Sequence, residues 1–172
     1  QFAAIREEVD RVQGLLADGG YRVIFRPHPQ AGRRLTAHAN AVRKITALLS
    51  AAPGGHYVDS TPRFGWQRDV ADALVCDISA VAVDWLTTGK PLVITRPVQP
   101  LAPILSGGML AALPLLSVER SGAIVEALEQ AAGPEEIAQL GRWAEYYFAA
   151  GDVGTFVDAV LELAGRTAEG TM

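Results

Sequence analysis

The sequence has little of what marks secreted, membrane-spanning and nucleic-acid-binding proteins. It contains 1 cysteine in 172 residues, Cys76, so no disulfide can form within the chain, and a reduced, cytoplasmic setting is expected. No uninterrupted apolar run reaches the roughly 18 to 20 residues that a membrane-spanning helix needs, and no signal-peptide pattern is present. The formal net charge of −4 argues against general nucleic-acid binding.

The sequence also lacks the common catalytic and metal-binding motifs. It has no Walker-type glycine loop, no GxGxxG segment and no nucleophile elbow. The spacing of His28, His38 and His56 matches no metal motif, and Cys76 has no second cysteine to act with it. We therefore expect neither a metal ion nor an organic cofactor.

Acidic residues are absent from one long stretch, Gly19 to Val58, which contains all three histidines. The other basic residues of this stretch are Arg22, Arg26, Arg33, Arg34, Arg43 and Lys44. A local cationic zone in an acidic chain suits a small anionic ligand better than a polyanion. The last four of these residues can instead decorate the solvated face of a helix.

A hydrophobic content of 49% argues against disorder, and its pattern indicates alternating helices and strands. Helices are predicted at residues 2–16, 33–50 and 79–88, and three more after residue 119, opened by Ser121, Pro134 and Asp152. Strands are predicted at residues 21–25, 56–59, 73–76, 92–95 and 115–118. The first, third and fourth of these strands should be buried. Residues 60–69 are expected to be a loop in which Asp69 opens a short helical turn.

Strands that are apolar on both faces and alternate with helices imply a parallel sheet covered on both sides. The predicted fold class is therefore α/β, with a doubly wound, mostly parallel sheet of about five strands and helices on both faces. Residues 1–166 should form a single Rossmann-like domain that binds a nucleotide diphosphate. Residues 167–172 should be a frayed tail.

The first candidate site is Arg26-Pro27-His28-Pro29, which follows the predicted strand 21–25. Each proline fixes its own φ and pushes the preceding residue towards extended geometry. His28 is therefore held at the carboxyl end of a strand, where ligands bind in sheets of this type. Its imidazole can donate a hydrogen bond to a phosphate oxygen, and Arg26 can add a bidentate clamp. The structural alternative is a histidine that caps a loop.

The second candidate site is Cys76 to Val81, where a strand ends and a helix starts at Ser79. The first N–H groups of that helix are unpaired and carry the positive end of its dipole. Small side chains at Ser79 and Ala80 let a phosphate approach closely. Asp77 is expected to brace the turn, and Asp84 either faces the crevice or is a solvated carboxylate. The structural alternative is that Ser79 only caps the helix.

These segments resemble the CDP-glycerol glycerophosphotransferases. Val23 to Pro29 is similar to that family's apolar strand followed by His-Pro, and Ala71 to Ser79 is similar to its Ala-Asp, apolar strand and Asp-Tyr-Ser-Ser signature. The resemblance covers Arg22 to Arg96 well and the rest of the chain weakly. Further counterparts are Asp84, Lys90, Pro91 and, more loosely, Gly151 and Asp152.

The resemblance implies the C-terminal, donor-binding domain of a two-domain GT-B enzyme whose N-terminal domain binds a polyol-phosphate or glycan acceptor. Such enzymes move a glycerol phosphate-like unit from CDP-glycerol, or a similar nucleotide diphosphate, to a cell-wall or capsule polymer. They work at the inner face of the membrane, with which the parent protein would associate peripherally. By position, His28, Ser79 and the N–H groups of Ala80 and Val81 would contact the donor diphosphate. This chain alone is expected to be inactive.

The sequence departs from the family pattern at several positions. Ile78 replaces the tyrosine and Ala80 replaces the second serine, so a phosphate-directed hydroxyl is missing. The family's Tyr…Arg-Gly segment after the fourth strand is replaced by Pro97 to Met109. Two other functions therefore stay open: a UDP-sugar glycosyltransferase or epimerase with the same fold, and a degenerate, non-catalytic nucleotide-binding domain.

Overall fold

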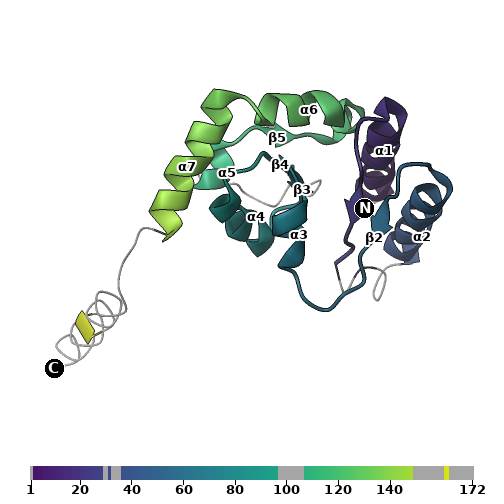
Figure 1. The fold of residues 1–172 in the computed structure, drawn as a ribbon, viewed down its shortest axis with the longest axis horizontal. Coiled ribbons are helices and arrows are strands. Elements are labelled where there is room, and N and C mark those ends of the chain that lie inside the picture. Colours follow the sequence, from purple (N-terminus) through teal and green to yellow (C-terminus); the bar gives the residue numbers. More distant parts are fainter. Residues whose placement is uncertain (1, 29–30, 32–35, 97–106, 149–160, 163–172) are drawn as a thin grey trace.

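The computed structural model describes residues 2–28, 31, 36–96, 107–148 and 161–162 (Figure 1). The start of the helix predicted at Asp152 and the predicted frayed tail at 167–172 lie outside the described residues. The described part is a mixed α/β fold in which helices are longer than strands. None of its helices is both long and apolar enough to cross a membrane.

The first two helices, α1 (Phe2–Asp18) and α2 (Thr36–Ala51), confirm the helices predicted at 2–16 and 33–50. They pack against each other at one end of the molecule (Figure 1). Their inward faces repeat apolar residues at helical spacing. The buried members are Val9, Val12, Ala41, Ile45 and Leu49.

Five parallel strands of the described residues divide into two sheets. In the first, β1 (Ile24–Phe25) pairs with β2 (Tyr57–Val58). The second has the order β3 (Leu74–Cys76), β4 (Leu92–Thr95), β5 (Leu115–Leu116). The prediction of one sheet of about five strands is therefore wrong. The parallel direction of the strands and their places in the sequence are confirmed.

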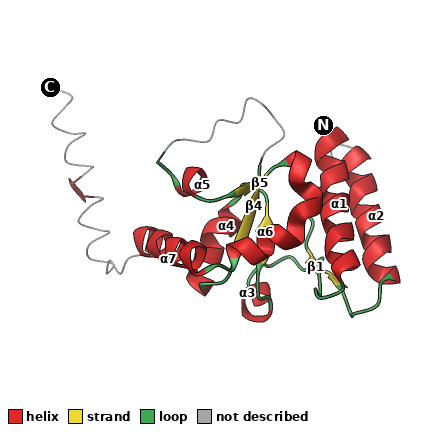
Figure 2. Cartoon of the chain, turned by 90° about the horizontal axis from the view of Figure 1, so that it is seen from above, coloured by secondary structure: helices red, strands yellow, loops and turns green. Residues whose placement is uncertain are grey.

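The division into two sheets arises because β1 and β3 do not pair with each other. Within the described residues no strand lies between them, so each forms an open edge of its own sheet. In Figure 2, β1 lies beside α1 and α2, whereas β4 and β5 lie among the later helices. Apolar runs reveal that strands exist, but they do not reveal which strands are hydrogen-bonded neighbours.

Helices cover both faces of the three-stranded sheet. Leu74, Leu92 and Ile94 face a core built with α4 (Ala80–Trp85) and α7 (Pro134–Phe148). Alternate strand residues face the opposite core, which contains α6 (Ile124–Ala131) and residues from the end of α1. The strand members of this second core are Val75, Val93 and Leu116, and Ala73, directly before β3, packs with them. The expectation of helices on both faces is confirmed for this sheet.

The remaining helices are short. They are α3 (Trp66–Val70), the 3-10 turn η1 (Leu86–Thr88), α5 (Met109–Ala112) and the 3-10 helix η2 (Val118–Ala123). Helix α4 and η1 together match the helix predicted at 79–88, and Gly89 ends it with a φ of 64°. Pro134 opens α7 as predicted.

Two helix starts were predicted wrongly. Ser121 does not cap a helix, because η2 surrounds it and α6 begins only after Ala123. The short helix near Asp69 begins earlier, after Gly65, whose N–H donates to Gln67 Oε1 at 2.8 Å. In both cases a polar residue of the turn, Ser121 or Gln67, is buried. Burial of that kind is set by tertiary contacts that local propensity does not include.

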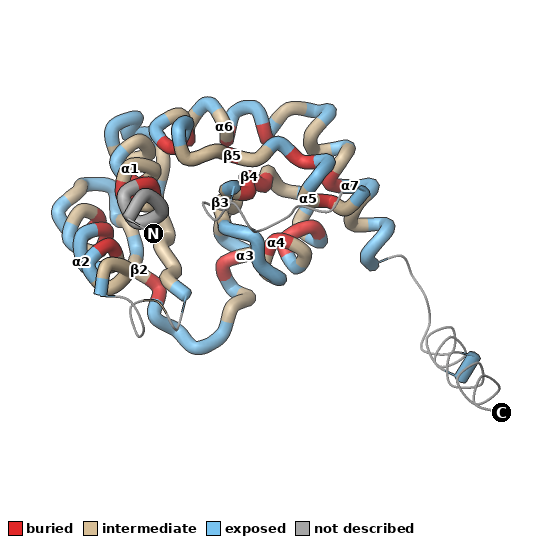
Figure 3. The backbone as a smooth tube through the Cα atoms, turned by 180° about the vertical axis from the view of Figure 1, so that it is seen from behind, coloured by how far each residue is buried: buried red, intermediate tan, exposed pale blue. Residues whose placement is uncertain are grey.

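Burial differs sharply between strands of similar composition. Leu92, Val93 and Ile94 of β4 are buried, as predicted, whereas every residue of β1 and β3 is only half-buried. Figure 3 shows this contrast, with buried segments at β4 and on the inner turns of α2 and α4. The prediction that residues 21–25 and 73–76 are fully buried is wrong, because each strand has a neighbour on one side only.

Candidate functional site

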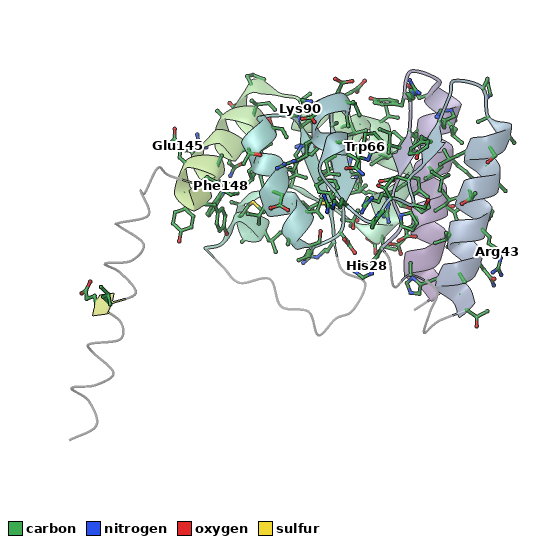
Figure 4. The ribbon with its side chains drawn as sticks, turned by 60° about the horizontal axis from the view of Figure 1, so that its bottom comes forward. His28, Arg43, Trp66, Lys90, Glu145 and Phe148 are labelled. Atoms are coloured by element: carbon green, nitrogen blue, oxygen red, sulfur yellow. The ribbon has the colours of Figure 1, made fainter. Side chains whose placement is uncertain are left out.

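The first candidate, His28, lies on the loop that leaves the carboxyl end of β1. Its side chain is exposed, and its carbonyl accepts a hydrogen bond from the N–H of Ala31 at 2.7 Å. In Figure 4, Lys90 lies on the upper side of the ribbon and His28 on the lower side. Lys90 precedes β4, so His28 lies on the side away from the start of β4.

The second candidate, the first turn of α4, follows the carboxyl end of β3. Ser79 is the N-cap residue, with φ −155° and ψ 164°, and its side chain makes no capping hydrogen bond. Its carbonyl accepts from the N–H of Ala82 at 3.1 Å. Ser79 and Ala80 are exposed and Val81 is half-buried. The alternative, in which the Ser79 hydroxyl only caps the helix, is therefore wrong. The N–H groups of the first turn of α4 receive no cap from this side chain.

The Ser79 hydroxyl interacts with Cys76 instead. Burial raises the pKa of the Cys76 thiol to about 12, and the charge of Asp77 acts in the same direction. A hydrogen bond with Ser79 opposes this increase in pKa without cancelling it. A thiol with so high a pKa stays protonated at neutral pH and is a poor nucleophile. Cys76 is therefore a structural residue beneath the first turn of α4.

Helix α1 brings charged residues to the same region. Burial raises the pKa of Glu8, and the charge of Asp77 adds to this increase. The charges of Arg11 and His38 lower the same pKa. Glu8 of α1 and His38 of α2 are thus within electrostatic range of each other, and Asp77 at the end of β3 is within range of Glu8. The predicted supporting residues Asp77 and Asp84 are both exposed. The side chains from α1 and α2 were not expected from the sequence.

Arg26, the predicted clamp, is engaged inside the protein. Its Nη1 forms a salt bridge with the buried Asp59 and donates to Thr61 Oγ1 at 3.2 Å. Its guanidinium carbon lies 5.9 Å from the centre of the Phe64 ring. Any contact between Arg26 and a diphosphate has to use the other guanidinium nitrogens. The main role that the structure gives this side chain is to join the loops that follow β1 and β2.

Asp59 is the centre of a polar cluster that sequence reasoning missed. Its side chain is fully buried, and it accepts hydrogen bonds from Arg26, from Gln67 Nε2, and from the N–H and hydroxyl of Thr61 at 2.9 and 2.7 Å. Burial alone would raise the pKa of Asp59, but these hydrogen bonds outweigh it and lower the pKa to about 2. The only signal in the sequence was an acidic residue directly after a strand.

Other basic residues of the acid-free stretch also have structural roles. Arg22 Nε donates to the carbonyl of Gly55 at 2.7 Å. His56 Nδ1 accepts from the N–H of Val23 at 3.1 Å, and its Nε2 lies 2.8 Å from the carbonyl of Pro53. Arg43 and Lys44 lie on the exposed face of α2, in agreement with the alternative that these residues decorate a solvated helix face. Arg33 and Arg34 lie outside the described residues. His28 is therefore the histidine of this stretch best placed for a ligand.

The described residues contain no group of three or more His, Cys, Asp or Glu side chains arranged to hold a metal ion. Two shallow surface hollows occur elsewhere. One lies along α7, between Glu135 and Arg142, and the other lies beside Lys90 at the amino end of β4. Neither of these two hollows is lined by His28 or Ser79.

The two candidates follow the strands whose edges are open. Strand β1 is one edge of the sheet β1-β2, and β3 is one edge of the sheet β3-β4-β5. Tyr21, which precedes β1, packs in one core with Ala73 and Val75 of the β3 segment. The β1 edge is thus the one nearer to the three-stranded sheet.

Comparison with protein-family models, with curated proteins and with solved structures found no match to this chain. The family suggested by the sequence motifs therefore stays a prediction.

Proposed function

We propose that this chain is the donor-binding domain of a transferase that moves a phospho-polyol unit, such as glycerol phosphate, from a nucleotide diphosphate to a cell-wall or capsule polymer. The finer fold proposed with it is one half of a GT-B enzyme. The acceptor would bind to a separate N-terminal domain. The parent protein would act at the inner face of the membrane.

The strand order carries this proposal. In doubly wound sheets, ligands bind outside the carboxyl ends of the strands, at the point where the order of the strands reverses. His28 follows β1 and Ser79 follows β3. The proposal takes these two strands as the ones on either side of that point. An exposed imidazole on one side and uncapped N–H groups on the other form two donor sets. Two linked phosphates offer acceptors to both.

The donor groups fit the chemistry of the transfer. The acceptor hydroxyl attacks the distal phosphorus of the donor, a new P–O bond forms, and the bond to the bridging oxygen breaks to release the nucleoside monophosphate. The hydroxyl proton passes to a base on the acceptor domain. Negative charge grows on the leaving phosphate, where His28 and the first N–H groups of α4 would stabilise it electrostatically. No side chain of this chain has to form a covalent intermediate.

One observation favours a second candidate, a degenerate nucleotide-binding domain. The Ile78 side chain is 39% exposed directly before Ser79, where the resembling family has a tyrosine. Ala80, also exposed, replaces a serine. An exposed apolar side chain and a missing hydroxyl remove polar contacts to a phosphate. Such a domain would keep the fold for regulation or assembly and would bind no donor.

Calorimetric titration of the chain with CDP, UDP, GDP and CMP tests the proposal. We expect CDP to bind more tightly than UDP and GDP, and more tightly than CMP, because CMP lacks the second phosphate. Tight UDP with weak CDP would instead favour a UDP-sugar transferase or epimerase. No binding of any of the four to well-folded protein would overturn the proposal in favour of the degenerate domain. Lys44→Ala, on the exposed face of α2, is the control for general charge effects.

A further inference from the structure

We propose that the hollow beside Lys90 binds a small molecule with a phosphate and hydroxyl groups, a polyol phosphate. The hollow has a volume of about 470 Å³, within the roughly 300–1,000 Å³ of pockets that hold small molecules. Lys90 lies on the upper side of the ribbon in Figure 4 and His28 on the lower side, so this site is separate from the candidate diphosphate site. The hollow is lined by residues of α3, of η1 and by the residue before β4, which are Arg68, Asp69, Thr87, Thr88 and Lys90.

The ammonium of Lys90 is held by the backbone and keeps one N–H donor to spare. Its Nζ donates to the carbonyls of Arg68 and Ala71, at 2.9 and 2.8 Å, near the end of α3. A lysine ammonium has three N–H donors, so these two bonds leave one. Among the described residues, no carboxylate forms an ion pair with Lys90, which is half-buried. A positive charge without a counter-ion thus borders the hollow.

Arg68 supplies a second cation at the same place. The hydrogen bond from Lys90 to its carbonyl ties the two residues together, and both line the hollow. The Arg68 guanidinium forms no hydrogen bond or ion pair with any residue in the described ranges. A guanidinium has five N–H donors in a plane, an arrangement that matches two oxygens of a phosphate. Two cations without partners beside one hollow favour an anionic ligand.

The other lining groups can only accept hydrogen bonds. The Thr87 hydroxyl donates to the carbonyl of Asp84 at 2.9 Å, and the Thr88 hydroxyl donates to the carbonyl of Trp85 at 2.7 Å. A hydroxyl has one proton, so both threonine oxygens are left as acceptors. The Asp69 carboxylate is exposed, has no ion-pair partner in the part of the chain that the structure describes, and accepts as well.

These donors and acceptors together define the class of ligand. The cations of Arg68 and Lys90 require an anionic group, and a phosphate monoester offers three acceptor oxygens and a charge of about −1.5 to −2 at neutral pH. The acceptors of Asp69 and Thr87 require hydrogen-bond donors, which hydroxyl groups on the same molecule supply. A simple anion would satisfy the cations but would leave these acceptors unused. A neutral polyol would leave the cations unpaired.

Calorimetric titration with glycerol 3-phosphate, methyl phosphate and glycerol tests the ligand class. Methyl phosphate has the same phosphate monoester group but no hydroxyl on carbon, and glycerol has the hydroxyls alone. We expect glycerol 3-phosphate to bind at least about 3-fold more tightly than methyl phosphate, because it adds hydrogen bonds to the acceptors. Glycerol should show no measurable binding. Absence of glycerol 3-phosphate binding to the folded chain, or binding no tighter than that of methyl phosphate, would overturn the proposal.

Two variants separate the phosphate contact from the hydroxyl contact, and both keep Lys90, whose loss would leave two carbonyls unpaired. Arg68→Ala should weaken glycerol 3-phosphate binding by at least about 10-fold, whereas Arg63→Ala, an exposed arginine outside the hollow, should change it by less than about 2-fold. Equal losses would reduce the binding to general charge attraction and overturn the site. Asp69→Ala should abolish the preference for glycerol 3-phosphate over methyl phosphate, and an unchanged preference would overturn the ligand class.

The place of binding is read from amide chemical shifts in an NMR titration with glycerol 3-phosphate. The amides of Arg68, Thr87 and Lys90 should shift in proportion to occupancy, and those of His28 and Ser79 should stay unchanged. Shifts confined to His28 and Ser79 would assign the ligand to the candidate diphosphate site and overturn the second site. Because the readout separates the two places, failure of CDP to bind would refute the proposed function without affecting this result.

Discussion

The guanidinium of Arg26 forms a salt bridge with the buried carboxylate of Asp59, although the two residues are separated by 33 positions in the sequence. The contact joins the loops that follow β1 and β2, the two strands of the smaller sheet. His28 lies two residues after Arg26, so this pair also fixes the base of the loop that carries the candidate phosphate ligand.

Asp59→Asn should destabilise the protein by about 2 kcal/mol at pH 7, because it weakens charge-assisted hydrogen bonds from Arg26, Thr61 and Gln67 in a buried position. Urea unfolding followed by circular dichroism measures the change. Asp72→Asn, an exposed carboxylate before β3, is the matched control and should lie within about 0.5 kcal/mol of the parent. A change of similar size for both variants would refute the assigned role of Asp59.

The Asp59 contribution should also depend on pH. Its pKa in the folded protein, about 2, is below the ordinary value of 3.8, so its stabilising effect is fully present above about pH 4. This effect should be lost as the pH falls from about 4 towards 2. The stability difference between the parent and Asp59→Asn should therefore be constant from pH 5 to 7 and shrink below pH 4. A difference that stays unchanged down to pH 2.5 would contradict this.

His28→Ala should weaken CDP binding by at least about 10-fold while changing CMP binding by less than about 3-fold. Hydrogen bonds to charged groups contribute about 1.5–3 kcal/mol, and the second phosphate is present only in CDP. Isothermal titration calorimetry measures both affinities. The exposed position of His28 makes a folding defect an improbable cause, and circular dichroism checks this. Equal losses for both nucleotides would count against a contact with the diphosphate.

Ala80→Ser should strengthen CDP binding, because it supplies a hydroxyl in the first turn of α4 where the resembling family has its second serine. The side chain is exposed, so the added oxygen meets no steric barrier. We expect an increase of about 3- to 10-fold, which corresponds to one modest hydrogen bond. Thr87→Ser, at an exposed position after α4, is the control. Unchanged or weaker CDP binding would argue that no phosphate lies near this turn.

Cys76 should react slowly with thiol reagents in the folded protein. Burial raises its pKa to about 12, so little thiolate exists at pH 8. Modification by Ellman's reagent can be followed by absorbance. It should be at least about 100-fold slower in buffer than in about 6 M guanidinium chloride, which unfolds the chain. A rate in buffer close to that of the unfolded chain would show that the thiol is accessible and ionised, contrary to its place beneath α4.

Local sequence patterns determined where the long helices and the strands lie. Helix α1, helix α2, the strand Leu92–Thr95 and the start of α7 at Pro134 all follow from apolar spacing and from proline and glycine preferences. These features depend on neighbours within a few residues, which a sequence displays directly. The positions of His28 and Ser79 after strands follow in the same way.

Tertiary structure alone decided how the strands are joined and what the charged residues do. The pairing of the strands into two sheets, the salt bridge between Arg26 and Asp59, and the contact of the Ser79 hydroxyl with Cys76 all bring together groups whose pairing depends on the folded arrangement. A strand's composition shows that it will be covered, but hydrogen bonding between strands is satisfied by whichever backbone lies alongside. That choice is made by packing of the whole chain, and local propensity carries no record of it.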